Sequence, residues 1–152
     1  MLSAAWRKVV RAASRALLAR EHLTPTAAAG RNGEEQAYWY LRGQGFIMAA
    51  RNYRPEGLRG EIDLIGWEGR GKARTLVFVE VKTRGVGALR APEAAVDSAK
   101  AAHIKSTAAA YRKAAHCYDA PYRFDVVTVE LPEKAGVAAE QAKIQHFRDA
   151  FR

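Results

Sequence analysis

The chain has 152 residues, of which 49% are hydrophobic and 27% charged, and its 25 Lys and Arg exceed its 16 Asp and Glu to give a net charge of +9. This length and balance are typical of one globular domain with its own core, and they exclude a disordered or fibrous protein. One cysteine, Cys117, excludes an internal disulfide and a multi-cysteine zinc site, and it fits a reducing cytoplasm. The excess of positive charge favours a polyanionic partner.

Residues 1–29 form a basic N-terminal extension with five cations and one anion. Apolar residues recur on one helical face and arginines on the other, which is typical of a solvated helix, a nucleic-acid arm or a membrane-surface segment. No apolar run reaches the roughly 18 residues of a membrane span, so we expect no transmembrane segment. Thr24-Pro25-Thr26 predicts a linker, which leaves residues 30–152 as the main domain.

The main domain alternates between helical and strand patterns. Asn32, with Glu35 three residues later, predicts a capped helix over 33–42. Three strands are expected next, separated by glycine-rich turns, over 46–53, 61–67 and 75–82. The third of these is richest in β-branched residues and is expected at the centre of the sheet.

A long alanine-rich helix is predicted over 92–115, because Pro92 occupies the favoured first turn. A fourth strand is expected over 122–129, and a short fifth over 143–147. This order predicts an α/β domain with a mixed central sheet of four or five strands, in which the long helix crosses over to a later strand.

Three carboxylates break the apolar pattern of the elements that contain them. Asp63 and Glu80 each interrupt an apolar strand, and the two-residue period puts Glu80 on the same face as Lys82. Glu34 follows the helical spacing of the apolar stripe that must face the sheet. Because burying an isolated carboxylate is costly, these groups should be paired, hydrogen-bonded or bound to a metal.

Carboxylate oxygens suit Mg²⁺ or Mn²⁺, which can polarise a phosphodiester and activate water. Lys82, beside two carboxylates, is expected to stay an ammonium and to position water or phosphate rather than to remove a proton. The alternative interpretation is a buried ion-pair cluster in which Asp63 and Glu80 pair with Lys82 or an arginine.

Four blocks of residues resemble one protein family, and they occur in its order: Gly33-Glu34, Gly60-Glu61-Ile62-Asp63-Leu64-Ile65, Phe78-Val79-Glu80-Val81-Lys82-Thr83-Arg84 and Arg123-Phe124-Asp125-Val126-Val127. From about Gly30 to Phe151, the chain resembles the YraN-like family of small bacterial proteins. That family is placed in the PD-(D/E)xK nuclease superfamily, near archaeal Holliday-junction resolvases and the tRNA-endonuclease-like fold. The resemblance implies a restriction-endonuclease-like domain of three layers, with helices flanking the mixed sheet.

By position, the resemblance implies that Glu34, Asp63, Glu80 and Lys82 are catalytic. It further implies that Asp63, Glu80 and the main-chain carbonyl of Val81 bind Mg²⁺ or Mn²⁺. The proline that precedes the metal-ligating aspartate in the superfamily is replaced by isoleucine in this chain.

Basic residues near the strand ends are candidates for phosphate contacts, and we assign this role to Arg59, Arg84 and Lys100. For Lys100, a position leaning toward the acidic residues and a solvent-exposed position both fit the helical pattern. Arg123 and Asp125 share one strand face and are expected to pair in a structural role.

The sequence therefore predicts a cytoplasmic, Mg²⁺- or Mn²⁺-dependent endonuclease-like protein that hydrolyses phosphodiester bonds in structured or branched DNA. One alternative is a nucleic-acid-binding module that keeps the fold without catalysis, and another is a membrane-surface protein led by residues 1–29. Symmetric resolution of a junction would require a homodimer, for which the sequence shows no interface.

Overall fold

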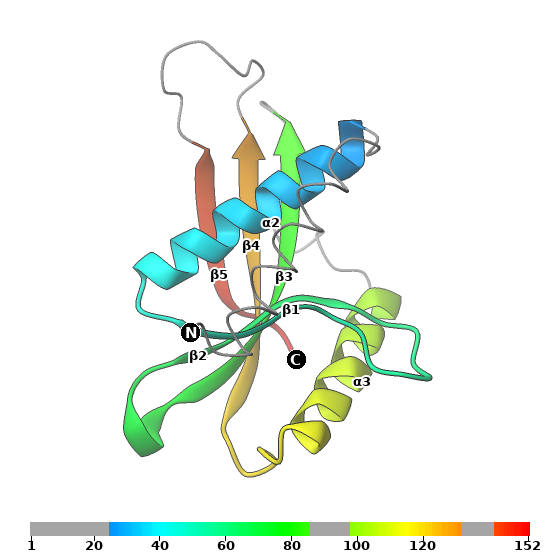
Figure 1. The fold of residues 1–152 in the computed structure, drawn as a ribbon, viewed down its shortest axis with the longest axis vertical. Helices are drawn as coiled ribbons and strands as arrows, with labels where there is room; N and C mark the ends of the chain where they lie inside the picture. The colour runs from blue at the N-terminus through cyan, green and yellow to red at the C-terminus, as the bar shows by residue number, and fades with distance from the viewer. Residues whose placement is uncertain (1–24, 86–97, 132–141) are drawn as a thin grey trace, which may run out of the picture.

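The computed structural model describes residues 25–85, 98–131 and 142–152, and Figure 1 shows their arrangement. The elements follow the chain in this order: α2 (Pro25–Gly43), β1 (Ile47–Tyr53), β2 (Ile62–Glu68), the short 3-10 helix η2 (Gly71–Ala73), β3 (Thr75–Gly85), α3 (Ser98–Ala114), β4 (Tyr122–Leu131) and β5 (Lys143–Phe151). No helix among the described residues is long and apolar enough to cross a membrane.

The five strands form one mixed sheet in the order β1-β2-β3-β4-β5. Neighbouring strands are antiparallel except β3 and β4, which are parallel, and α3 lies between these two strands in the chain. β3 therefore occupies the centre of the sheet, as the β-branched pattern predicted.

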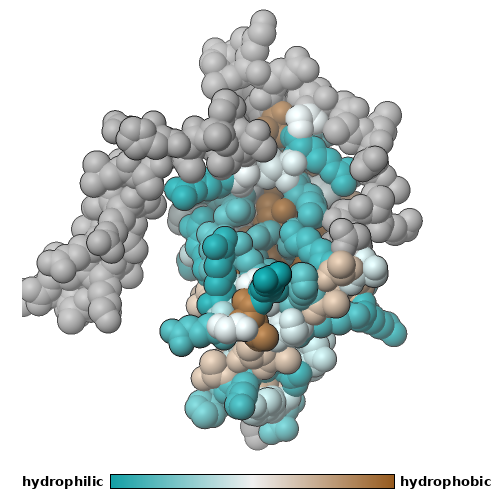
Figure 2. Space-filling view, turned by 90° about the vertical axis from the view of Figure 1, so that its right-hand side faces the viewer, coloured by the Kyte–Doolittle hydropathy of each residue, from teal (hydrophilic) through white to brown (hydrophobic). Residues whose placement is uncertain are grey.

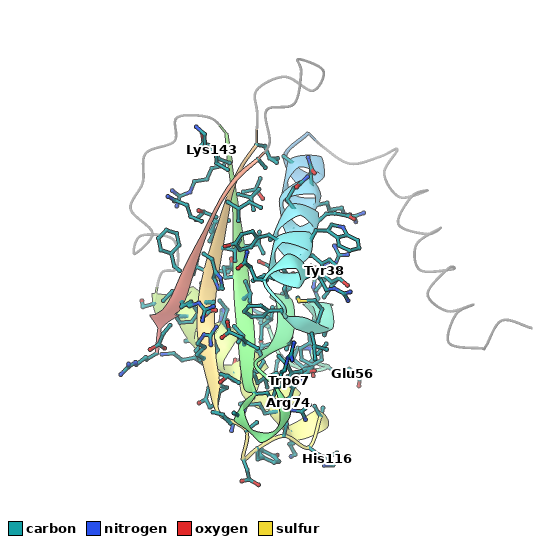
Figure 3. All side chains as sticks on the ribbon, turned by 90° about the vertical axis from the view of Figure 1, so that its left-hand side faces the viewer. Tyr38, Glu56, Trp67, Arg74, His116 and Lys143 are labelled. Atoms are coloured by element: carbon teal, nitrogen blue, oxygen red, sulfur yellow. The ribbon has the colours of Figure 1, made fainter. Side chains whose placement is uncertain are left out.

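The two helices cover opposite faces of this sheet, so the domain has three layers. Ala37 and Leu41 of α2 pack in one core cluster with alternate residues of β3, including Val79. Ile104 of α3 packs in a second cluster that contains Phe78, which points to the other face of β3. Figure 3 shows the sheet nearly edge-on, with α2 along one face. The predicted α/β fold is confirmed, and the arrangement is compatible with a restriction-endonuclease-like domain.

Two predicted boundaries were wrong by four residues or more. α2 begins at Pro25, well before the predicted start at residue 33, because proline is favoured at the first helical position and the alanines that follow extend a helix readily. Residues 25 and 26 of the predicted linker therefore belong to the helix, and Asn32 lies inside it. β5 continues to Phe151 instead of ending at 147. Residues 1–24, and residues 92–97 of the predicted long helix, lie outside the described residues.

A buried ionic network ties β2, β4 and β5 together. Asp125 is fully buried and accepts hydrogen bonds from Arg123 Nε (2.9 Å) and from the backbone N–H of Asp149 (2.9 Å), and His146 Nε2 lies 2.8 Å from its second oxygen. Arg123 also donates to Glu68 at 2.7 Å. The predicted pairing of Arg123 with Asp125 is confirmed. Burial favours the neutral form of Asp125, but the bonds from His146, Arg123 and Asp149 outweigh it and lower its pKa.

Replacing Asp125 by Asn should destabilise the fold at neutral pH by about 3 kcal/mol, because it removes the charge that the buried cation faces. Since the pKa of Asp125 is lowered in the folded state, its stabilisation is present above the ordinary aspartate pKa of 3.8 and is lost as the pH falls through the folded-state value. Urea denaturation measures both effects. The exposed Asp119→Asn is the matched control, and equal losses in the two variants would contradict a structural role for the network.

Candidate functional site

The predicted acidic residues approach one another where β2 begins, beside the second half of β3 and the start of α3. Asp63 is the second residue of β2, Glu80 and Lys82 lie in β3, and Lys100 is the third residue of α3. The loop between β1 and β2 passes close to α3 (Figure 1), where a Cβ on residue 60 would overlap Oγ1 of Thr107. Separate elements thus bring these side chains to one place.

Asp63 is fixed across the β2–β3 pair. The backbone N–H of Val81 donates a hydrogen bond of 2.7 Å to Asp63 Oδ2. Burial, together with the nearby charge of Glu80, raises the pKa of Asp63 to about 7, and the hydrogen bond from Val81 opposes these effects only in part. Asp63 therefore takes up a proton near neutral pH unless a cation compensates its charge.

Glu80 is almost completely buried, with a side-chain exposure of 2%. Its Oε1 accepts a hydrogen bond from Lys100 and lies 2.9 Å from Lys82 Nζ, so both lysines compensate one oxygen. Its Oε2 is buried and has no hydrogen-bond partner among the described residues. A buried carboxylate oxygen without a partner is costly, and this one is available to a cation.

Lys100 leans toward the acidic residues, which decides between the two positions that the sequence allowed. Burial lowers the pKa of Lys100, but its hydrogen bond with Glu80 and the charges of Glu80 and Asp63 outweigh burial, and the pKa is raised. Lys100 is therefore an ammonium at neutral pH.

Glu34 acts on this group through its charge, which raises the pKa of Asp63. Its position depends on Gly33, the preceding residue of α2. A Cβ on residue 33 would overlap Oγ1 of Thr83 in β3, so only glycine lets the helix approach the end of β3 this closely.

A cavity of about 360 Å³ opens beside Asp63 and Lys100, and it is lined by Gly60, Glu61, Asp63, Ala99, Lys100, His103 and Ile104. The sequence pattern assigned no role to Glu61 or His103. Glu61 lies two residues before Asp63, and His103 lies one helical turn after Lys100, so their spacing from predicted site residues was the available signal. Glu61 also pairs with Arg54.

The predicted phosphate-binding residues differ in how closely they approach the cavity. Arg59 is exposed and precedes Gly60, which lines the cavity. Arg84 is half-buried and follows Lys82 by two residues, so it shares that face of β3. Lys100 lines the cavity itself.

The donor set suits a hard divalent cation that keeps water or phosphate in its other positions. Within residues 25–85, 98–131 and 142–152, no three His, Cys, Asp or Glu side chains group closely enough to enclose a metal on their own. Mg²⁺, however, usually takes only one or two carboxylates from a protein. Asp63 and the unpartnered Oε2 of Glu80 fit that requirement.

Asp63→Asn should stabilise the metal-free protein at about pH 8, since the raised pKa means that the folded state binds a proton more tightly than the unfolded chain. The free energy of unfolding should fall as the pH rises from about 4 to about 7 in the wild type and should lose this dependence in the variant. We expect a gain on the order of 2 kcal/mol, because Asn still accepts the Val81 hydrogen bond.

Chemical denaturation with a chelator at about pH 5 and pH 8 checks this expectation, with Asp119→Asn as the exposed control. Destabilisation of Asp63→Asn at the higher pH would show that Asp63 is held as a compensated charge without any metal.

Comparison with known proteins identifies the family. The model of the family described as "Uncharacterised protein family UPF0102" matches residues 33–129, a span that contains every predicted site residue. A UPF0102 protein of Koribacter versatilis is 43% identical over 103 residues, covering 67% of this chain and 68% of the relative. One from Solibacter usitatus is 41% identical over 122 residues (80% and 84%), and one from Geotalea uraniireducens is 37% identical over 122 residues (80% and 87%). The chain therefore belongs to the UPF0102 family, which confirms the YraN-like resemblance of its sequence.

Proposed function

We propose that this protein is a metal-dependent, endonuclease-like hydrolase of the PD-(D/E)xK superfamily that cleaves phosphodiester bonds in structured or branched DNA. The observation that carries the proposal is the buried carboxylate of Glu80. Its Oε2 has no hydrogen-bond partner among the described residues, and it lies near Asp63, whose pKa is raised. Strongly perturbed carboxylates next to a cavity are a feature of functional sites.

A Mg²⁺ or Mn²⁺ ion held by Asp63, Glu80 and the carbonyl of Val81 would polarise the scissile phosphate and neutralise charge on the leaving oxygen. The Val81 N–H keeps Asp63 oriented toward that position. Lys82 and Lys100 hold Glu80 in place and set two ammonium groups where negative charge would develop on the phosphate. Lys82 then positions water or phosphate and does not act as a base.

The charge of the chain supports a nucleic-acid substrate. Carboxylates at a cleavage site repel a phosphate backbone, and the net charge of +9 offsets this repulsion over the molecule. Arg59, next to the cavity, and Arg84, on the face of Lys82, would contact phosphates on either side of the site. A homodimer would place two such sites on the two strands of a junction. The single free cysteine, Cys117, is consistent with action in a reducing cytoplasm.

A second candidate is a nucleic-acid-binding module without catalysis. Lys82 and Lys100 already compensate Glu80, so much of the cluster is satisfied as an ion-pair network in the absence of a metal. Such a module would use the same basic residues to bind DNA and would leave the phosphodiester bond intact.

Cleavage assays with Mn²⁺ on junction, flap and duplex DNA test the first candidate. We expect the wild type to cleave branched substrates, and Asp63→Asn or Glu80→Gln to lower the rate by roughly 100-fold or more. Asp119→Asn and Glu56→Gln are matched controls, because both carboxylates are exposed and lie outside the cavity lining. Calorimetry with Mn²⁺ distinguishes the two candidates. A protein that binds DNA but not the metal would be the binding module.

Arg59→Gln should weaken DNA binding and lower the slope of log affinity against log salt by about 1, because one phosphate contact is removed. Fluorescence anisotropy over a range of salt concentrations measures this slope. Arg42→Gln, at the exposed end of α2, removes the same charge elsewhere. A slope that changes equally in both variants would mean that Arg59 acts only through the net charge.

A further inference from the structure

A second concave surface lies on the opposite flank of α3 from the Asp63 cavity. It has a volume of about 560 Å³ and is formed by the second half of α3, the start of β4 and the end of β5. In Figure 1 the end of β5 lies beside the lower part of α3. The α3 side of the molecule, shown in Figure 2, presents mostly hydrophilic residues around smaller hydrophobic patches. We call this surface the α3–β5 groove.

Cations dominate the lining of the groove. The lining contains one carboxylate, Asp149, and four basic residues: Lys105, Arg112, Arg123 and Arg152. Arg123 is engaged in the buried network with Asp125, and Arg152 forms an exposed ion pair of 3.1 Å with Asp149, which is a weak interaction in water. Lys105, Arg112 and Arg152 therefore remain to meet an anion.

Arg112 is stacked against an aromatic ring within the groove. Its guanidinium lies 4.0 Å from the centroid of the Tyr122 ring, and its Nη2 donates to the carbonyl of Tyr118. Tyr122 is 46% exposed and meets Phe124 edge to face at 5.8 Å, while Phe124 stacks on Phe151 at 5.0 Å. The groove thus combines a cation–π stack with a rigid aromatic floor.

The hydrogen-bonding capacity of Arg112 is not used up by the protein. Its Nε is buried and has no acceptor among the described residues. Because this Nε is buried, what Arg112 offers to a ligand is the plane of its guanidinium and not this N–H. A base, for its part, stacks favourably on tyrosine and on a guanidinium plane.

We propose that the α3–β5 groove binds an unpaired nucleotide of a DNA strand, with its base stacked on the Arg112–Tyr122 pair and its phosphate near Lys105 and Arg152. This inference rests on the proposed function only in that the chain binds DNA. A paired base could not use the groove, because its faces are covered by its neighbours in the duplex.

The position of the groove relates it to the proposed cleavage site. Lys100 and Arg112 are separated by twelve residues of α3, or about 18 Å along the helix axis. At about 3.4 Å per base pair, this distance corresponds to roughly five base pairs of duplex. A single-stranded tail or a branch point at about that distance from the scissile bond would reach the groove, which gives the protein a preference for structured DNA.

Anisotropy in EDTA tests the groove without cleavage, using a blunt duplex and the same duplex with a single-stranded tail of about ten nucleotides. We expect the wild type to bind the tailed duplex more tightly. Tyr122→Ala and Arg112→Ala should each weaken binding to the tailed duplex roughly tenfold and hardly affect the blunt duplex. Tyr122→Phe, which keeps the ring, should bind like the wild type.

Two further variants guard against loss of folding and against a plain charge effect. Lys105→Gln changes an exposed side chain and should weaken binding to the tailed duplex by a few-fold while the melting temperature stays unchanged. Lys113→Ala removes a charge next to Arg112 from an exposed position outside the groove lining, and it should affect both duplexes equally and little.

The inference is overturned if the tail adds no affinity, if Tyr122→Phe loses as much as Tyr122→Ala, or if Lys113→Ala matches Arg112→Ala. These outcomes differ from failure of the proposed nuclease. If cleavage is intact but the tail preference is absent, only the proposed groove function is contradicted. If the tail preference is intact but cleavage is absent, only the proposed nuclease activity is contradicted.

Discussion

The burial of one carboxylate, Glu80, is the constraint on which the rest of the site depends. Its strand, β3, pairs with β2 up to Val79 and with β4 at Glu80 itself, and this pairing fixes the face of the sheet to which the side chain points. A charge in such a place costs several kcal/mol unless opposite charges compensate it. Lys82 from the same strand and Lys100 from α3 do so at one oxygen, and this compensation ties the start of α3 to the centre of the sheet. Lys100 also lines the cavity beside Asp63, so this contact fixes one part of the cavity wall.

Asp125, which is buried, and Asp63, which is half-buried, differ in whether their surroundings stabilise the charge of the carboxylate. Asp125 accepts bonds from Arg123 and the backbone and has a lowered pKa, so its surroundings already stabilise its charge. Asp63 accepts one backbone bond, lies near Glu80 and Glu34, and has a pKa raised to about 7. Natural proteins tolerate such unfavourable groups where they serve a function. A bound cation would stabilise the charge of Asp63, whereas the charge of Asp125 is already stabilised by its neighbours.

Much of the fold could be predicted from short-range periodicity, and the candidate site residues from that periodicity together with the resemblance to the YraN-like family. The two-residue period placed Glu80 with Lys82, and the strand patterns located β1 to β4. Features that depend on contacts between distant elements could not be predicted in this way. Whether the Lys100 side chain lies in solvent or against Glu80 depends on how α3 crosses the sheet. The hydrogen bond from the Val81 N–H to Asp63 can be predicted only when the register of β2 against β3 is known. The α3–β5 groove needs the last residues of β5, which the pattern did not assign to a strand.

Helix α3 is the common wall of both concave surfaces, and this has a mechanical consequence. Ile104 and Ala108 pack into the core between the two surfaces, with Thr107 buried beside them. Because protein interiors are close-packed, the helix cannot move away from the Asp63 side without pressing on the side that carries Arg112. The β1–β2 loop packs against Thr107 of α3, because Gly60 has no side chain that would overlap it. A ligand in the groove would therefore contact the same helix that positions Lys100 at Glu80.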